Sequence, residues 1–238
     1  EIDACALQCP GPILRLKKEM EKIAAGETIR ITTTDPGFAK DIEAWAKSTG
    51  NALLDLKAEG GKFSAVIRKE AKGAATAPAA DYSKKKTIIV FSNDLDKAIA
   101  AFIIANGALA MGSEVTMFFT FWGLNVLRKS KPAVVKKNLI EKMFGFMMPR
   151  GPEKLSLSKM NMGGMGALMI KGLMKKKNVA SLAELIETAK KAGARFVACT
   201  MSMDLMGIKK EELIDGIEEG GVAMYLANAE SGNVNLFI

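Results

Sequence analysis

Residues 1–23 read EIDACALQCPGPILRLKKEMEKI, and this stretch decides the fold of the first part of the chain. Residues 2–7 form a short, mostly apolar run that predicts a strand. The apolar side chains after it recur at helical spacing, at Ile13, Leu16, Met20 and Ile23. Between the two patterns stands Cys9-Pro10-Gly11-Pro12. A helix is therefore predicted to begin at Cys9, with Pro10 as its first residue.

Cys9 is the first candidate catalytic residue. At the start of a helix, free backbone N–H groups and the helix dipole favour a thiolate. Pro10 and Pro12 are supporting residues that stiffen the turn and present the sulfur outward. A thiolate attacks sulfane sulfur, so Cys9 is expected to form a persulfide. The alternative is a structural cysteine that only packs. Cys5, four residues earlier, either resolves that persulfide or packs, and packing is favoured.

The rest of the first segment completes a small domain. Residues 28–34 predict a strand, and Asp35-Pro36 opens a second helix that runs to Lys47. Residues 53–56 and 63–67 predict a closing pair of strands around Gly60-Gly61. The predicted order is βαβαββ, which forms a two-layer sandwich.

A change of composition marks the domain boundary. Residues 69–86 read KEAKGAATAPAADYSKKK, which is small and polar without an apolar period and is typical of a mobile linker. The predicted domains are therefore 1–70 and 86–238, joined by a flexible linker at 71–85. Residues 1–70 hold 11 basic and 11 acidic side chains, so nearly all of the net charge of +8 lies beyond them.

The second segment alternates strands and helices. Strands are predicted at 87–91, 115–121, 195–200 and 222–226, and helices at 94–111, 181–192 and 209–219. This alternation predicts a three-layer α/β domain with a parallel sheet. Residues 128–177 fit it less well and are interpreted as a helical insertion.

Cys199 is the second candidate catalytic residue. It ends the strand predicted at 195–200, and the carboxyl ends of parallel strands are where sites form in open α/β sheets. Buried cysteines are also common, and an Ala-Cys-Thr sequence at a strand end is often only core packing. Position alone leaves the two interpretations equal.

Composition excludes several kinds of chemistry. The chain has no His, which excludes Cys-His dyads, Ser-His-Asp triads and most zinc sites. Neither a metal nor a cofactor is therefore expected. Three cysteines, an odd number, without a secretory signal argue for reduced thiols rather than a disulfide framework. No apolar run is long enough to span a membrane, so a cytoplasmic protein is expected.

Met and Lys are concentrated in the second segment. All but one of the 15 Met lie there, and they are expected either to fill a core or to form an adaptable docking surface. Two basic clusters are interpreted as solvated faces that could still attract an anionic ligand. They are Arg128, Lys129, Lys131, Lys136 and Lys137, and Lys171, Lys175, Lys176 and Lys177. A glycine-rich turn at 163–166 is only a weak phosphate signal, and nucleic acid is not expected as a partner.

The sequence from Asp3 to Pro12, DACALQCPGP, resembles the opening of the TusA/SirA family of sulfur carriers. The βαβαββ order agrees with this family over residues 1 to 70. The resemblance implies that Cys9 carries a persulfide. One departure is Ala6, where the family often has Gly, and it leaves the motif itself intact.

Residues 84–238 resemble the DsrE-like superfamily, in its longer Met-rich branch, through 87–93 and ACTMSMDLMG at 198–207. This resemblance implies a sulfur site at Cys199 and suggests a homo-oligomer formed through this domain. The tandem is also similar to the C-terminal part of some flavin-dependent CoA-disulfide or persulfide reductases. A rhodanese, such a reductase or a small thiol is then the expected partner.

Together these features predict a sulfur carrier or sulfurtransferase that passes sulfane sulfur between Cys9 and Cys199 or a partner protein. The alternative is a non-catalytic redox-sensing or docking module of a larger reductase.

Overall fold

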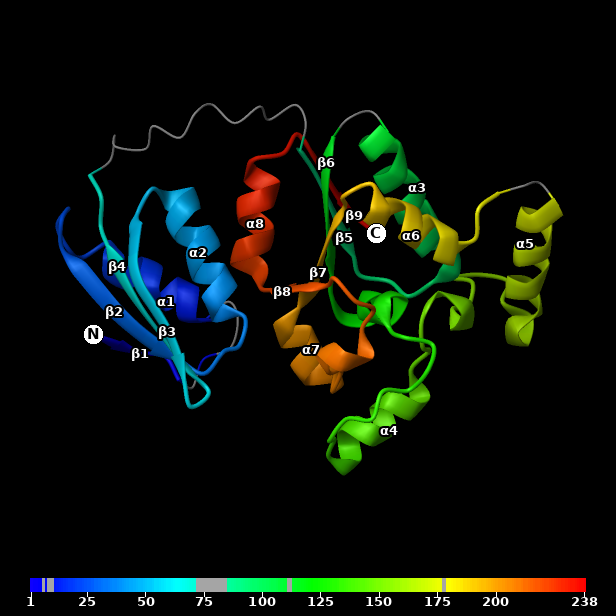
Figure 1. Cartoon of the computed structure of the whole chain (residues 1–238), viewed down its shortest axis with the longest axis horizontal. Coiled ribbons are helices and arrows are strands. Elements are labelled where there is room, and N and C mark those ends of the chain that lie inside the picture. The colour runs from blue at the N-terminus through cyan, green and yellow to red at the C-terminus, as the bar shows by residue number, and fades with distance from the viewer. Residues whose placement is uncertain (6, 8–10, 72–84, 111–112, 177–178) are drawn as a thin grey trace. The chain divides into compact units, whose positions relative to one another are not determined.

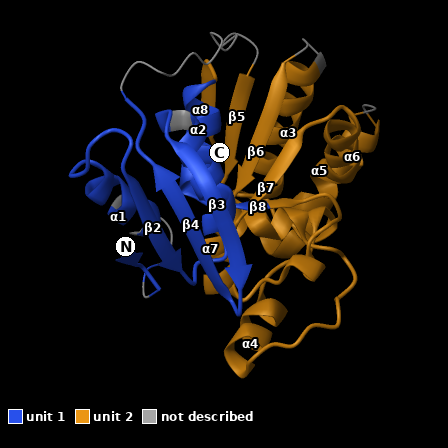
Figure 2. Ribbon diagram, turned by 60° about the vertical axis from the view of Figure 1, so that its left-hand side comes forward, with its two compact units in different colours: residues 1–82, 219–231 blue, residues 83–218, 232–238 orange. Residues whose placement is uncertain are grey.

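The computed structural model describes residues 1–5, 7, 11–71, 85–110, 113–176 and 179–238 (Figure 1). The chain divides into two compact units (Figure 2), one of residues 1–82 and 219–231 and one of residues 83–218 and 232–238. The expected linker at 71–85 falls almost entirely outside the described residues, so its flexibility stays a prediction.

The first unit contains a four-stranded sheet. Strand β1 pairs parallel with β2, and β4 pairs antiparallel with both β2 and β3, in the order β1-β2-β4-β3. Its N-terminal elements are β1 (Ile2–Asp3), α1 (Gly11–Met20), β2 (Thr28–Thr33), α2 (Phe38–Thr49), β3 (Ala52–Glu59) and β4 (Lys62–Arg68). The expected βαβαββ sandwich is thereby confirmed.

Apolar periodicity explains these elements. In α1, Ile13, Leu16 and Met20 are 8%, 0% and 4% exposed, so the predicted stripe is the buried face. Side chains alternate between buried and exposed along β2, as expected for a strand with one face on the core. Strand β1 is shorter than the predicted 2–7, because the Cys5 N–H donates to the Asp3 carboxylate at 3.0 Å and turns the chain.

The first unit also includes α8 (Val222–Glu230), where a strand was predicted at 222–226. That prediction was wrong. The buried carboxylate of Asp41 in α2 accepts hydrogen bonds from the N–H groups of Gly221, at 2.8 Å, and Met224, at 3.2 Å. These donors are free N–H groups of a first helical turn, so the contact stabilises the start of a helix.

The second unit is built on a five-stranded parallel sheet in the order β8-β7-β6-β5-β9. The strands are β5 (Lys85–Val90), β6 (Glu114–Phe119), β7 (Arg195–Cys199), β8 (Glu218–Gly220) and β9 (Val234–Phe237). The helices α3 (Leu95–Ala110) and α6 (Leu182–Lys191) pack against each other, and the Asn106 side chain donates to the Leu185 carbonyl at 3.0 Å. Three mutually packed aromatic rings form the centre of the core, Phe102, Phe119 and Phe196. The α/β class is confirmed.

The segment at 128–177 contains short helices, as expected. Helix α4 (Leu139–Met147) begins with a capping box between Asn138 and Glu141, and α5 (Met165–Lys176) follows the glycine turn. Single 3₁₀ turns lie at Pro152–Lys154 and Met162–Gly164. Another 3₁₀ segment, η1 (Phe121–Leu127), follows β6.

The helix predicted at 209–219 is absent from this described part of the chain. In its place are a 3₁₀ turn at Lys210–Glu212 and strand β8. Gly216 has a φ of 81°, which a right-handed helix cannot accommodate. The Glu212 side chain is buried in an ionic cluster instead of lying on a helix surface. A short α7 (Thr200–Met206) and β9 were also not predicted. No helix of the described residues has the length and hydropathy needed to cross a membrane.

Candidate functional site

Cys9 and Pro10 lie outside the described residues, so the structure is described only on either side of them. Strand β1 ends at Asp3, and α1 begins at Gly11, the third residue of the motif. Pro12 is buried in the first turn of α1. The predicted start of the helix at Cys9, with Pro10 as its first residue, falls outside the described residues and stays a prediction.

Cys5 is half-buried beside the sheet of the first unit. Its thiol lies 3.9 Å from the Thr32 carbonyl oxygen, and its own carbonyl accepts a hydrogen bond from the Thr34 hydroxyl at 2.6 Å. A hydrogen bond between the Cys5 thiol and the Asp3 side chain raises the pKa of the thiol, and desolvation and the charge of Asp3 act in the same direction. This environment favours a neutral thiol, which is a poor nucleophile.

Cys199 is the last residue of β7 and the residue before α7. Its side chain is 4% exposed. Strand β7 pairs parallel with β6, so Cys199 lies at the carboxyl edge of the sheet, where sites form in this class of fold. The thiol is well placed along the strand, but sulfur exchange with another molecule requires a local opening.

Three hydroxyl groups and a close contact between two backbone segments lie at this carboxyl edge of the sheet. The hydroxyls of Thr120, after β6, and Ser202, in α7, are hydrogen-bonded at 2.8 Å. The hydroxyl of Thr200 is buried and has no hydrogen-bond partner among the described residues. Gly123 passes so close to β5 that a Cβ would lie 2.0 Å from the Val90 carbonyl oxygen. The loops after β5, β6 and β7 therefore meet at one edge.

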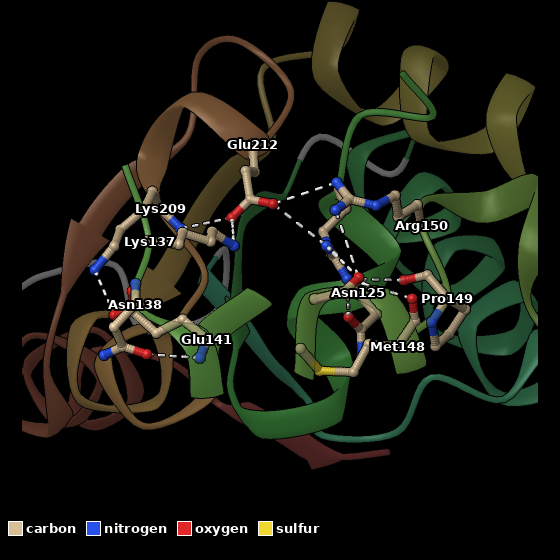
Figure 3. Close-up of polar contacts among 11 residues, drawn as sticks. Asn125, Lys137, Asn138, Glu141, Met148, Pro149, Arg150, Lys209 and Glu212 are labelled. Carbon is tan, nitrogen blue, oxygen red and sulfur yellow. Dashed lines mark hydrogen bonds and ion pairs between the residues drawn. The ribbon is translucent and has the colours of Figure 1, made fainter. Parts of the chain in front are cut away.

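An ionic cluster that sequence reasoning missed lies elsewhere in the second unit (Figure 3). The guanidinium of Arg128 is fully buried and pairs with Glu212 at 3.3 Å. Glu212 also pairs with Arg150, at 3.2 Å, and with Lys137, whose side chain is 6% exposed. The interpretation of the cluster from Arg128 to Lys137 as a solvated face is therefore wrong at both ends, because these residues neutralise a buried carboxylate.

Backbone carbonyls complete the surroundings of Arg128. Its guanidinium donates to the carbonyls of Gly145, Met148 and Pro149 and to the Asn125 side chain at 3.3 to 3.5 Å. Burial lowers the pKa of Arg128, and the neighbouring charge of Arg150 adds to this effect. The cluster fixes the α4 segment onto the chain before β8.

The pKa of Glu212 is governed by opposing effects. Burial acts to raise it, but hydrogen bonds from the Lys137 ammonium and the Lys209 N–H, with the charges of Lys137 and Arg128, outweigh burial and hold the pKa below its ordinary value. Lys209 also joins Glu141 of α4 at 3.0 Å. The carboxylate therefore stays ionised in the folded protein.

The methionines divide into two groups. Met148, Met203 and Met206 are buried in the core, as the packing interpretation expected. Six others in the 128–177 segment are more than half exposed, Met143, Met147, Met160, Met162, Met165 and Met169. In the second basic cluster, Lys171 pairs with the Glu153 carboxylate at 3.8 Å and donates to the Glu153 backbone carbonyl at 2.8 Å.

No group of three or more His, Cys, Asp or Glu that could hold a metal occurs among the residues that the structure describes.

Comparisons with known proteins match both parts of the chain. Residues 83–237 match the model of the DsrE/DsrF/DrsH-like family, and residues 1–69 match that of sulfurtransferase TusA. The protein YrkE of Bacillus subtilis is 59% identical over 66% of this chain and 99% of its own length. The sulfur carrier protein DsrE2 of Allochromatium vinosum is 40% identical over 65% of this chain and 98% of its own length.

A second carrier from the same organism matches the N-terminal part. The sulfur carrier protein TusA of Allochromatium vinosum is 49% identical over 29% of this chain and 91% of its own length. Among solved structures, the ychN protein of E. coli matches with a TM-score of 0.41 and 13% identity, over 65% of this chain and 99% of that one.

Proposed function

Because the chain belongs to the DsrE/DsrF/DrsH-like family through residues 83–237 and to the TusA family through residues 1–69, we propose that it relays sulfane sulfur as a persulfide on Cys9. Cys199, or a cysteine of a partner protein, exchanges that sulfur with Cys9. The observation that carries the proposal is the pairing, in one chain, of two segments whose relatives are each named sulfur carriers.

The first step is nucleophilic attack on a donor persulfide. The Cys9 thiolate attacks the outer sulfur of the donor, a Cys9 S–S bond forms, and the S–S bond of the donor breaks. The donor leaves as a thiolate, which takes up the proton that Cys9 gave up. One S–S bond replaces another, so the step needs neither an oxidant nor a reductant.

The second step repeats this chemistry at the next cysteine. The Cys199 thiolate attacks the outer sulfur of the Cys9 persulfide and releases Cys9 as a thiolate. Since Cys199 is 4% exposed, the surrounding loops must open before the sulfurs can meet. In the closed state, the burial of Cys199 would protect a stored persulfide from small reductants.

Cys5, predicted as a supporting residue, does not carry the sulfur in this account. Its pKa is raised by the hydrogen bond with Asp3, so at neutral pH it is a weaker nucleophile than an ordinary thiol. We therefore place sulfur on Cys9 in preference to Cys5.

The finer assignments remain proposals. We propose domains at 1–70 and 86–238 with a flexible linker at 71–85, a cytoplasmic location, and a homo-oligomer formed through the second domain. A rhodanese-type donor or a small thiol is the proposed partner. The resemblance to flavin-dependent reductases is not supported, since the relatives reported above carry names of sulfur carriers or of no activity.

Loading with a sulfane-sulfur donor tests the proposal. Intact-protein mass spectrometry after incubation with a small-molecule persulfide should show the mass of added sulfur on the wild-type chain. Cys9→Ser should lose most of this added mass, whereas Cys5→Ser, the matched control, should keep it. If neither Cys9 nor Cys199 takes up sulfur, the carrier function is rejected and the docking module is favoured.

A further inference from the structure

A cavity of about 880 Å³ lies in the second unit beside the buried ionic cluster. It is lined by α4, by the turn that follows α4 and by Glu212. Sites that hold small molecules usually measure about 300 to 1,000 Å³, so the cavity is large enough for an organic molecule. Neither of the two described cysteines, Cys5 and Cys199, lines it.

The lining carries an excess of positive charge. Four cationic side chains and two carboxylates face it, Lys137, Lys142, Arg150, Lys154, Asp94 and Glu212. Glu212 is already paired with Arg128, Arg150 and Lys137. The carboxylate of Asp94 is paired with Lys97, at 2.7 Å, which lies outside the lining.

The excess positive charge of the lining comes from Lys142 and Lys154. Both are exposed, and neither forms an ion pair within the described part of the chain. Arg150 is 25% exposed and uses one amino group on Glu212 and one on the Gly145 carbonyl, at 3.2 and 3.4 Å. Because a guanidinium has five N–H donors, Arg150 retains donors for a further oxygen acceptor.

The cluster behind the cavity holds Arg150 in place. Arg128 is fully buried and contacts the same Glu212 oxygen as Arg150 does. Two guanidinium groups therefore share one carboxylate oxygen, and the repulsion between them contributes to the lowered pKa of Arg128. An anion at Arg150 would reduce this repulsion.

Besides the polar side chains of Asn93, Ser130 and Ser156, the remaining lining consists of apolar groups. They include Phe146, Met147, Met148 and Pro149, which follow one another at the end of α4. Inorganic anions would leave these groups in contact with water, whereas a ligand with an apolar portion would cover them.

We propose that this cavity binds a small organic anion, a phosphate ester or a polycarboxylate, whose charged group contacts Arg150, Lys142 and Lys154 and whose apolar portion packs on Phe146 and Met147. Guanidinium and ammonium donors bind both kinds of oxyanion, and apolar lining next to a few convergent polar groups is typical of ligand sites. The site goes beyond the proposed sulfur relay, because its charged contacts are lysine and arginine side chains and neither of the described cysteines lines it.

Calorimetric titration of the full chain tests the proposal. Phenyl phosphate and phthalate are the probes for the two classes of anion, and phenol is the neutral control with the same ring as phenyl phosphate. At least one of the two anions should bind with a Kd of about 1 mM or below, and phenol should not. Inorganic phosphate should bind more weakly than phenyl phosphate, because it lacks the apolar portion. Equal binding of phosphate would contradict the apolar contact.

Two double variants with the same loss of charge locate the site. Lys142→Gln with Lys154→Gln should weaken binding by about tenfold or more. Lys159→Gln with Lys191→Gln removes two exposed lysines that do not line the cavity and should leave the affinity unchanged. If the double variant Lys142→Gln with Lys154→Gln unfolds more easily than the wild type, the affinity of the single variant Lys154→Gln is measured instead. Absence of binding by both anions, or equal weakening in both pairs, overturns the proposal.

Discussion

Arg128 and Glu212 form an ion pair of 3.3 Å between side chains that are 0% and 1% exposed, although 84 residues separate them in the sequence. The pair joins the end of η1 to the 3₁₀ turn that precedes β8. Removing one partner of a buried pair leaves the other charge uncompensated in a region that excludes water.

Replacing Glu212 should therefore destabilise the protein strongly. Glu212→Ala leaves Arg128, Arg150 and Lys137 without their carboxylate, and we expect a loss of about 3–5 kcal/mol in the free energy of unfolding. Urea denaturation followed by circular dichroism measures it. The control is Glu153→Ala, which removes an exposed ion pair with Lys171 and should cost about 0–1 kcal/mol. An equal loss of unfolding free energy in both variants would mean that the buried cluster contributes no more to stability than an exposed ion pair does.

The same carboxylate should make stability depend on pH. The pKa of Glu212 is lowered in the folded protein, so the unfolded chain takes up its proton first as the pH falls. The contribution of Glu212 is complete at neutral pH and is lost as the pH falls from the ordinary value of 4.5 through the folded pKa. The difference in unfolding free energy between wild type and Glu212→Gln, measured from neutral to acidic pH, should shrink over this range. A constant difference would contradict the assignment.

Asp3 should control the reactivity of Cys5. Its hydrogen bond and its charge raise the pKa of Cys5, so Asp3→Asn should lower that pKa and speed alkylation of Cys5 by iodoacetamide near neutral pH. The measurement uses a chain with Cys9→Ser and Cys199→Ser, in which Cys5 is the only thiol. If the pH dependence of the alkylation rate is the same in Asp3→Asn as with Asp3 present, Asp3 does not raise the pKa of Cys5.

Cys199 should react slowly in the folded protein. Since it is 4% exposed, its alkylation requires local opening, and the rate should rise steeply in denaturant. A chain with Cys5→Ser and Cys9→Ser isolates this thiol, and a cysteine-containing peptide gives the unprotected rate. If Cys199 reacts as fast as the peptide, the thiol is accessible and no opening step is needed.

Two hydroxyls beside Cys199 should respond in opposite ways. Ser202→Ala breaks the 2.8 Å hydrogen bond with Thr120 and should cost about 0.5–1.5 kcal/mol of unfolding free energy. The Thr200 hydroxyl has no partner among the described residues, so Thr200→Val should be neutral or stabilising. Thermal unfolding of both variants tests this pair of expectations. A large loss in Thr200→Val would mean that this hydroxyl has a partner in solution.

Periodicity made part of the fold predictable. The stripe of α1 and the alternation of β2 are local signals, because one side of each element packs on the core. Residues 222–226 were predicted as a strand because a short apolar run fits either structure, and the helix found there is stabilised by the distant carboxylate of Asp41.

The candidate site was less accessible to sequence reasoning. The Cys-Pro-x-Pro motif made Cys9 a candidate, and the end of a predicted strand made Cys199 a candidate. The buried cluster left no such signal, since Arg128 and Lys137 stand in a lysine-rich run and Glu212 is distant in the sequence. The capping box at Asn138 and Glu141 was the one local sign of ordered structure after this run.

The most direct test of the account is a time course of sulfur on each cysteine. The wild-type chain is mixed with a limiting amount of a small persulfide donor, quenched with an alkylating reagent in denaturant, and mapped by peptide mass spectrometry. The account predicts that the Cys9 persulfide forms first, that the Cys199 persulfide follows as Cys9 loses sulfur, and that Cys9→Ser abolishes both. Sulfur on Cys199 at an unchanged rate in Cys9→Ser, or no sulfur on either cysteine, would contradict the relay.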